Sequence, residues 1–419
     1  MVMQTQLREP DSGFDQFDFD PRLHRGIAAA GFEEPRPIQA GAVPAALRGR
    51  DILGLAQTGT GKTAAFAIPA IHRLLQDRRD GPRVLVVAPT RELAAQISVE
   101  FESLARFTAL RVATVFGGVS VNGQRRALSR KPQIIVACPG RLLDLVGQRI
   151  VRLDRIELLV LDEADHMFDM GFLPDIRRIV AELPTERQNL LFSATMPADI
   201  RGLADQMLRD PHVVDVAHRS RLETIEHALY PVENTRKLAL LERILEDRAL
   251  RSAIVFTRTK HRARRLARQL ERSGHRVVAL QGNMSQGQRE RAMEGFRKRQ
   301  FDVLVATDIA ARGIDVQQVS HVVNFDMPNT PDAYTHRIGR TGRADREGNA
   351  YTFVTAEDRS LVARVERRLQ MSIPRREVRG LESTSASRPA KRKRGAGPRR
   401  RRATVGGDAG GRRARSRNR

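Results

Sequence analysis

The chain has 419 residues, long enough for two or three domains that each bury a core of their own. Its composition, 41% hydrophobic and 29% charged, is typical of a folded globular protein. The single cysteine, Cys138, excludes an intramolecular disulfide and favours a reducing compartment. No apolar run approaches the roughly 18 residues of a membrane-spanning helix. We therefore expect a cytoplasmic protein with no membrane association.

Basic residues give the chain a formal net charge of +24, and this charge is unevenly distributed. Residues 388–419 carry 14 Lys or Arg side chains and one acid, Asp408, so they hold about half of the excess. The segment from Glu382 onward is rich in Ser, Gly, Pro and Arg and poor in large apolar residues, which predicts disorder. Clustered arginines favour a flexible tether for a polyanion such as nucleic acid, although a solubilising tail is the simpler alternative.

Two series of short apolar runs, separated by helical patterns, predict two parallel sheets buried on both faces. We therefore predict α/β architecture with two tandem doubly wound domains at residues 1–217 and 225–377, a linker at 218–224 and a disordered tail at 378–419. The predicted strands of the first series are Ile52–Ala56, Val84–Ala88, Ile134–Ala137, Leu158–Leu161 and Leu190–Phe192. Those of the second are Ala253–Phe256, Val277–Leu280, Val303–Ala306, Val322–Phe325 and Ala350–Val354.

A phosphate-binding loop follows the first predicted strand. Residues 56–63 read AQTGTGKT and open a helix, where glycines let backbone N–H groups surround phosphate oxygens. Lys62 would reach the terminal phosphates of ATP and Thr63 would hold Mg²⁺. The alternative is a glycine-rich turn without a nucleotide, since Ala56 stands where glycine is usual. The remaining nucleotide-contacting residues of the loop are predicted to be Thr58, Gly59, Thr60 and Gly61.

An acidic tetrapeptide, DEAD at 162–165, follows the apolar strand 158–161. The carboxyl ends of strands are where α/β folds bind ligands. Asp162 suits a second contact to Mg²⁺, and Glu163 is then placed to orient or deprotonate the attacking water. Taken alone, the cluster would more simply be a solvated helix cap; the phosphate-binding loop favours the functional interpretation.

These motifs, in this order and spacing, resemble the DEAD-box family of superfamily 2 RNA helicases, whose two domains are RecA-like. The resemblance extends over residues 14–375 and is closest to the bacterial RhlE-like branch. Phe14 and the segment GFEEPRPIQ at 31–39 resemble the family's Q motif. The resemblance implies that Gln39 hydrogen-bonds the adenine edge and that Phe32 stacks on the ring, with Phe14 in the same site.

The resemblance also implies RNA contacts in both domains, made to the backbone and without base readout. Cys138 departs from the family, which usually has Thr there, and the lost hydroxyl could weaken one phosphate contact. The chain has no Trp and three Tyr, so aromatic stacking on bases should be minor. The implied RNA-binding residues are Pro89, Thr90, Arg91, Gly117, Gly118, Pro139, Gly140, Arg141, Arg258, Gln286, Arg289 and Thr307.

Residues 306–315 and 336–343 match the family's motifs V and VI. The resemblance implies that Asp315 contacts the ribose and that Arg340 and Arg343 stabilise charge at the γ-phosphate. Because these arginines and the phosphate-binding loop belong to different domains, we expect domain closure to gate hydrolysis. The residues implied to couple hydrolysis to strand separation are Asp165, Ser193, Thr195 and His336.

The leading hypothesis is a monomeric, ATP-dependent RNA helicase that separates short duplexes or remodels ribonucleoprotein. A second hypothesis is an ATP-gated RNA clamp or assembly scaffold that hydrolyses slowly. A third is a DNA-directed ATPase of the same superfamily. Comparing stimulation of the ATPase by RNA and DNA separates the first hypothesis from the third.

Overall fold

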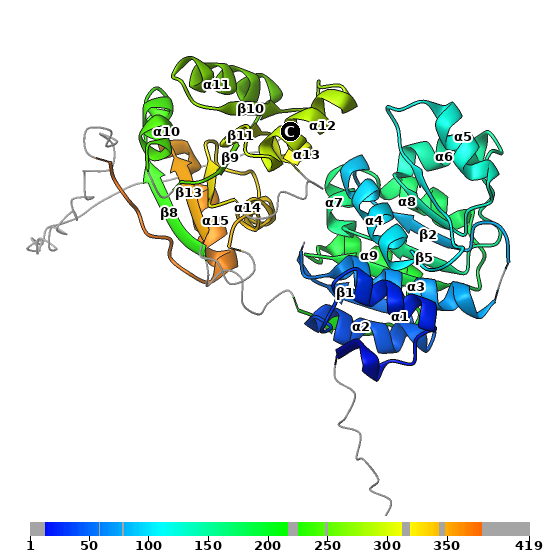
Figure 1. The fold of residues 1–419 in the computed structure, drawn as a ribbon. Helices are drawn as coiled ribbons and strands as arrows, with labels where there is room; N and C mark the ends of the chain where they lie inside the picture. Colours follow the sequence, from blue (N-terminus) through cyan, green and yellow to red (C-terminus); the bar gives the residue numbers. More distant parts are fainter. Residues whose placement is uncertain are drawn as a thin grey trace, which may run out of the picture. The chain divides into compact units, whose positions relative to one another are not determined.

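The computed structural model describes residues 13–57, 59–77, 79–216, 225–247, 250–311, 319–342 and 348–378. Within these ranges the chain forms two parallel β-sheets, each flanked by helices (Figure 1). No helix in the described ranges is long and apolar enough to cross a membrane. Thr58, Asp315, Arg343, the predicted linker and the tail from residue 379 onward lie outside the described residues.

The first sheet has the order β3-β4-β2-β5-β6-β1-β7 in the described part of the chain. Its central strands are apolar and fully buried, as in the VLVV of β2 and the LLVL of β5, because helices cover both faces. The strands are β1 (Ile52–Leu55), β2 (Val84–Val87), β3 (Val112–Val115), β4 (Ile134–Ala137), β5 (Leu158–Leu161), β6 (Gln188–Ser193) and β7 (His212–Asp215).

Two apolar cores lie on the two faces of this sheet. Side chains of α1 to α4 pack on one face, and those of α5 to α9 pack on the other. The helices are η1 (Gly13–Gln16), α1 (Pro21–Ala29), α2 (Pro37–Leu47), α3 (Lys62–Gln76), α4 (Arg91–Leu104), α5 (Val121–Ser129), α6 (Pro139–Gly147), α7 (Ala164–Asp169), α8 (Leu173–Ala181) and α9 (Ala198–Met207).

The second sheet has the order β10-β11-β9-β12-β13-β8 in the described residues. Helices α10 and α11 cover one face, and α12 to α15 cover the other. The strands are β8 (Ile225–Pro231), β9 (Ala253–Phe256), β10 (Val277–Leu280), β11 (Val303–Ala306), β12 (His321–Asn324) and β13 (Gly348–Val354). The helices are α10 (Lys237–Leu245), α11 (Lys260–Arg272), α12 (Gln286–Arg297), α13 (Asp308–Ala311), α14 (Pro331–Ile338), η2 (Ala356–Asp358) and α15 (Arg359–Leu369).

The two doubly wound sheets confirm the predicted fold class, but three strands are missing from the prediction. These are β3, β7 and β8, and each lies at an edge of its sheet. In β3 and β7, buried side chains alternate with more exposed ones, so neither strand has the continuous apolar run used to find the others. Strand β6 also begins two residues before the predicted Leu190, because polar Gln188 and Asn189 are buried through hydrogen bonds.

Candidate nucleotide and RNA sites

The phosphate-binding loop connects β1 to the N-terminus of α3, as the sequence predicts. Gly61 caps α3 in the left-handed conformation, with a φ of 92°. A side chain at Gly61 would be strained by this φ and would also press on the Gln39 amide. The loop therefore brings its backbone to the positive end of a 15-residue helix, which favours a bound anion.

Lys62 is the first residue of α3 and is buried. Its Nζ has no hydrogen-bond partner among the residues that the structure describes, and it lies 3.6 Å from Oδ1 of Asp162. An ammonium group removed from water without hydrogen bonds is costly, and phosphate oxygens would supply the missing acceptors. The loop therefore fits the terminal phosphates of a nucleotide. The Thr63 hydroxyl and the Asp162 carboxylate provide the oxygen donors that Mg²⁺ prefers.

Gln39 ties the Q motif to the phosphate-binding loop. Its Nε2 donates to the Gly61 carbonyl over 3.0 Å, and its Oε1 accepts from the Arg36 backbone N–H over 2.8 Å. The Arg36 guanidinium also donates to the Gly59 carbonyl over 3.1 Å. Gln39 is fully buried, so its predicted adenine contact requires a local rearrangement and stays a prediction.

The two aromatic residues assigned to the adenine site differ in exposure. Phe14 is buried and packs edge-on against Phe32, with ring centroids 6.1 Å apart. Phe32 is half-buried and retains exposed surface that a base could cover. Phe14 therefore supports the Phe32 ring in this structure. Stacking on the adenine ring stays a prediction for Phe32.

The two leading carboxylates of the DEAD tetrapeptide have opposite pKa shifts. Burial raises the pKa of Asp162 to about 6, against the opposing charge of Lys62. Burial also raises the pKa of Glu163, but the hydrogen bond from His166 and the charges of Lys62 and Arg340 outweigh it, so this pKa falls below its ordinary value. An ionised Glu163 is better suited to orienting a water molecule than to removing its proton.

Glu163 occupies a strained backbone position at the start of α7. Its φ of 52° and ψ of 54° are left-handed, a conformation that is uncommon for a non-glycine residue. The His166 Nδ1 lies 3.0 Å from Glu163 Oε2 and holds the side chain in one orientation. His166 was not assigned a role from the sequence, although a histidine one helical turn after the acid is a detectable signal.

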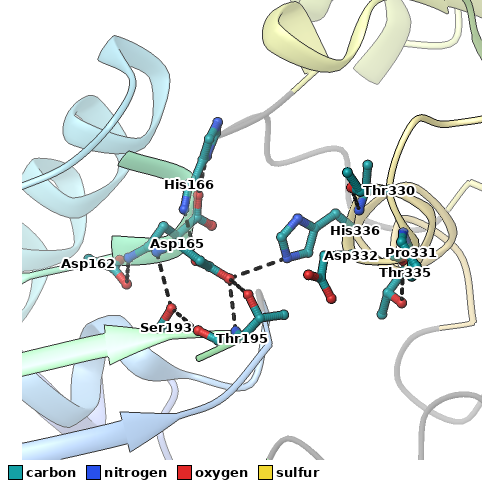
Figure 2. Close-up of polar contacts among 12 residues, drawn as sticks. Asp162, Asp165, His166, Ser193, Thr195, Thr330, Pro331, Asp332, Thr335 and His336 are labelled. Carbon is teal, nitrogen blue, oxygen red and sulfur yellow. Dashed lines mark hydrogen bonds and ion pairs between the residues drawn. The ribbon is translucent and has the colours of Figure 1, made fainter. Parts of the chain in front are cut away.

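Asp165 is the centre of the predicted coupling cluster (Figure 2). Its Oδ2 accepts from the Thr195 backbone N–H at 2.9 Å and the Thr195 hydroxyl at 2.8 Å, and it lies 3.5 Å from Nε2 of His336. Its backbone N–H donates to the Ser193 hydroxyl over 3.2 Å. Burial raises the pKa of Asp165, but the bonds with His336 and Thr195 lower it to about 2. The other three predicted coupling residues therefore contact Asp165, Thr195 and His336 through its carboxylate and Ser193 through its backbone N–H.

Two arginines of motif VI have different surroundings: Arg337 lies on α14, and Arg340 lies in the turn after it. Arg340 is buried and borders, with His336, a cavity that Lys62 and Glu163 also line. Arg337 instead binds within the second sheet: its guanidinium donates to both Asp308 oxygens, at 2.5 and 2.8 Å. Arg337 was not assigned a role from the sequence, and the structure makes it the main polar link between motifs V and VI.

The predicted RNA contacts of the first sheet come from loops after three neighbouring strands, β2, β4 and β3. The Arg91 guanidinium lies where a side chain at Gly118 would point, and Gly118 has a φ of 78°. Arg141 Nη1 donates to the Val119 carbonyl over 3.4 Å. Thr90 Oγ1 caps α4 by accepting from the Leu93 N–H over 3.3 Å. The structure thus brings three separate motifs together on one edge of the sheet.

Cys138 begins α6 without the side-chain cap that the usual Thr would provide. Its thiol is buried, and burial raises the pKa to about 12. A protonated, buried thiol is a poor nucleophile. We therefore interpret Cys138 as a small packing residue.

The predicted RNA contacts of the second sheet also follow strand ends. The Arg258 N–H donates to Asp326 Oδ2 over 2.9 Å after β9, and Thr307 follows β11. Gln286 begins α12, and its buried Oε1 accepts no hydrogen bond from the described part of the chain. Arg289 donates to Glu92 Oε1 over 2.8 Å, which occupies one side of its guanidinium. The predicted contacts of the second sheet thus come from the ends of β9 and β11 and from the start of α12.

Two parallel α/β sheets, with a phosphate-binding loop after β1 and an acidic tetrapeptide after β5, define a RecA-like ATPase. The DEAD/DEAH box helicase family matches residues 36–203, and the helicase conserved C-terminal domain matches residues 236–345. The ATP-dependent RNA helicase CshA of Listeria monocytogenes is 44% identical over 354 residues, covering 84% of this chain and 68% of the relative. The corresponding CshA of Bacillus subtilis is 41% identical over 365 residues, covering 86% and 73%.

A solved structure gives the same result. Saccharomyces cerevisiae Dbp5 bound to RNA and ADP BeF3 has a TM-score of 0.80 and 30% identity, covering 88% of this chain and 96% of Dbp5. The chain belongs to the DEAD-box family of ATP-dependent RNA helicases.

Proposed function

We propose that this protein hydrolyses ATP in response to RNA and uses the cycle to separate short RNA duplexes or remodel ribonucleoprotein. The observation that carries the proposal is the Asp165 cluster, because a single carboxylate contacts the Ser193–Thr195 segment and His336. A displacement of Asp165 therefore changes the contacts of the Ser193–Thr195 segment and of His336, and a displacement of either of these changes the contacts of Asp165. The names of the relatives and the RNA-bound Dbp5 structure support the same function.

We assign the nucleotide-site roles from the geometry. Lys62 and the loop backbone bind the ATP phosphates, and Glu163 orients the attacking water. Thr63 and Asp162 would hold Mg²⁺, which would neutralise phosphate charge when bound. Arg340 supplies positive charge at the γ-phosphate, and Arg343 and Asp315 are proposed from the motifs alone.

We propose that RNA binds through its backbone across the strand-end loops. The first set of contacts is the Arg91, Gly118 and Arg141 region, and the second is the Arg258 and 286–289 region. Backbone amides, small polar groups and arginines position phosphates and carry little base information. The affinity for RNA should therefore depend little on the RNA sequence.

Single-stranded RNA is expected to stimulate steady-state ATP turnover strongly, while DNA of the same length and sequence stimulates it weakly. The reason is that a site that follows the sugar–phosphate backbone can distinguish RNA from DNA by the ribose 2′-hydroxyl groups. The measurement is phosphate release with each polymer at saturation. Equal stimulation by DNA would assign the chain to the DNA-directed alternative, and tight ATP-dependent RNA binding without turnover would assign it to a clamp.

Deleting residues 388–419 is expected to weaken RNA binding and to flatten its dependence on salt, while turnover at saturating RNA stays close to that of the full chain. Each lost phosphate contact lowers the log–log salt slope by about 0.7 for a single strand. The control replaces the 14 basic residues of this segment with Ser or Gly at constant length. A salt slope unchanged by both variants would contradict the tether.

A further inference from the structure

Helix α11 has more Lys and Arg residues than any other described helix that flanks the second sheet. Its sequence, KHRARRLARQLER, contains six Lys or Arg residues and one Glu. The apolar side chains Ala263, Leu266, Ala267 and Leu270 pack onto the sheet. The opposite face exposes four arginines, which we call the α11 arginine face: Arg264, Arg265, Arg268 and Arg272.

The α11 arginine face lacks acidic partners among the described residues. Other basic side chains nearby do have them: Arg262 lies 3.0 Å from Asp326, and Arg276 lies 2.6 Å from Asp302. Like charges one helical turn apart, as in residues 264, 268 and 272, destabilise a helix. The fold therefore maintains a concentration of positive charge that no interaction within the described residues explains.

This face is continuous with two proposed RNA-binding elements. Helix α11 begins at Lys260, two residues after Arg258, and its 13 residues extend about 20 Å along the helix axis. Lys260 Nζ donates to Asn283 Oδ1 over 3.0 Å, which ties the start of α11 to the loop before α12 (Figure 1). Arg264 also lines a groove with Gln288, a member of the 286–289 segment. The α11 arginine face therefore begins beside Arg258 and the 286–289 segment, which are proposed to contact RNA.

We propose that the α11 arginine face is a further RNA-binding surface, which contacts phosphates of the strand beyond those held by the motifs. The proposal rests on the proposed function. It extends the RNA site along a surface that lies outside the motifs. Contacts of this kind position a strand and raise affinity without reading its sequence.

The composition of the surface favours RNA over an acidic protein. Arginine guanidinium groups match phosphate geometry in a bidentate manner. A protein interface usually has an apolar or aromatic centre. The exposed large apolar side chains in the described ranges are Val99, Val119, Val213 and Met371, and none of them lies on α11.

The test is a triple substitution in the full chain, Arg265→Gln, Arg268→Gln and Arg272→Gln, which keeps helix propensity nearly constant. The matched control neutralises Arg155, Arg177 and Arg364 in the same way, because these arginines are exposed, unpaired among the described residues and outside the motifs. RNA affinity is measured as a function of salt for oligonucleotides of about 6 and about 20 nucleotides, which bracket common single-strand site sizes.

We expect the triple variant to bind the longer RNA at least about tenfold more weakly near ~0.1 M salt, with a log–log slope lower by about 2. The affinity for the shorter RNA and all values for the control variant should stay unchanged. Equal affinity and slope for the longer RNA would overturn the proposal. The proposal would also be overturned if the triple variant lost binding to polyglutamate but kept its binding to RNA, because the surface would then belong to an acidic polypeptide. Stimulation of ATP turnover by the shorter RNA reports separately on the proposed function, which fails if the wild type shows none.

Discussion

Glu163→Gln is expected to reduce RNA-stimulated ATP turnover by about 10²–10⁴-fold while ATP-dependent RNA binding persists. The substitution preserves the shape of the side chain but removes the negative charge that would hold the attacking water. It should not disturb the phosphates, because Lys62 and the phosphate-binding loop are unchanged. The measurement is phosphate release at saturating RNA, paired with RNA binding in the presence and absence of ATP.

Glu182→Gln is the matched control, since Glu182 is an exposed carboxylate at the end of α8 in the same half of the chain. It should behave as the wild type in both assays. If Glu163→Gln retained more than a third of wild-type turnover, another group would have to orient the water. If it lost RNA binding as well, the carboxylate would be needed for ATP binding and not specifically for hydrolysis.

The low pKa of Glu163 also predicts how pH acts on this step. A lowered pKa means that the carboxylate loses its charge only in strongly acidic solution. The deprotonation of Glu163 therefore cannot be the source of any change in turnover between neutral and mildly acidic pH.

The sequence was sufficient for those parts of the fold that depend on continuous apolar runs and glycine-rich turns. Strands such as β2 and β5 are buried on both faces, so their residues are almost uniformly Val and Leu. Strand β8 was missed because its segment includes Glu226, His227 and Pro231. These residues are tolerated at an edge, where one side of the strand has no neighbour.

The candidate site was predictable where a motif specifies backbone geometry, and less so where it depends on packing. Gly61 and Lys62 stand where the loop pattern places them. The use of both Gln39 amide atoms within the protein was not predictable, because the Q motif alone does not show how closely α2 approaches the phosphate-binding loop. His166 and Arg337 acquire their roles only from tertiary contacts.

Substituting the two described arginines of motif VI should have contrasting effects. Arg340→Ala is expected to lower turnover by about 10³–10⁵-fold, the range measured for arginine fingers, with little change in melting temperature. Arg337→Ala is expected to destabilise the second sheet's domain by about 3 kcal/mol, because it leaves Asp308 unpaired. The measurements are phosphate release at saturating RNA and thermal unfolding of each variant.

The physical reason for the contrast is what each guanidinium contacts. Arg337 Nη1 donates to Asn324 Oδ1 at 3.1 Å and to the Asp326 carbonyl at 2.8 Å, and its guanidinium lies 5.1 Å from the Phe256 ring centroid. These contacts stay within one sheet, so their loss lowers stability. The positive charge of Arg340 instead lowers the pKa of Glu163, and so acts at the proposed reacting centre. A large fall in melting temperature for Arg340→Ala with normal turnover would reverse the two assignments. Arg337→Lys should restore only part of the stability, because an ammonium group cannot reproduce the paired bonds to Asp308.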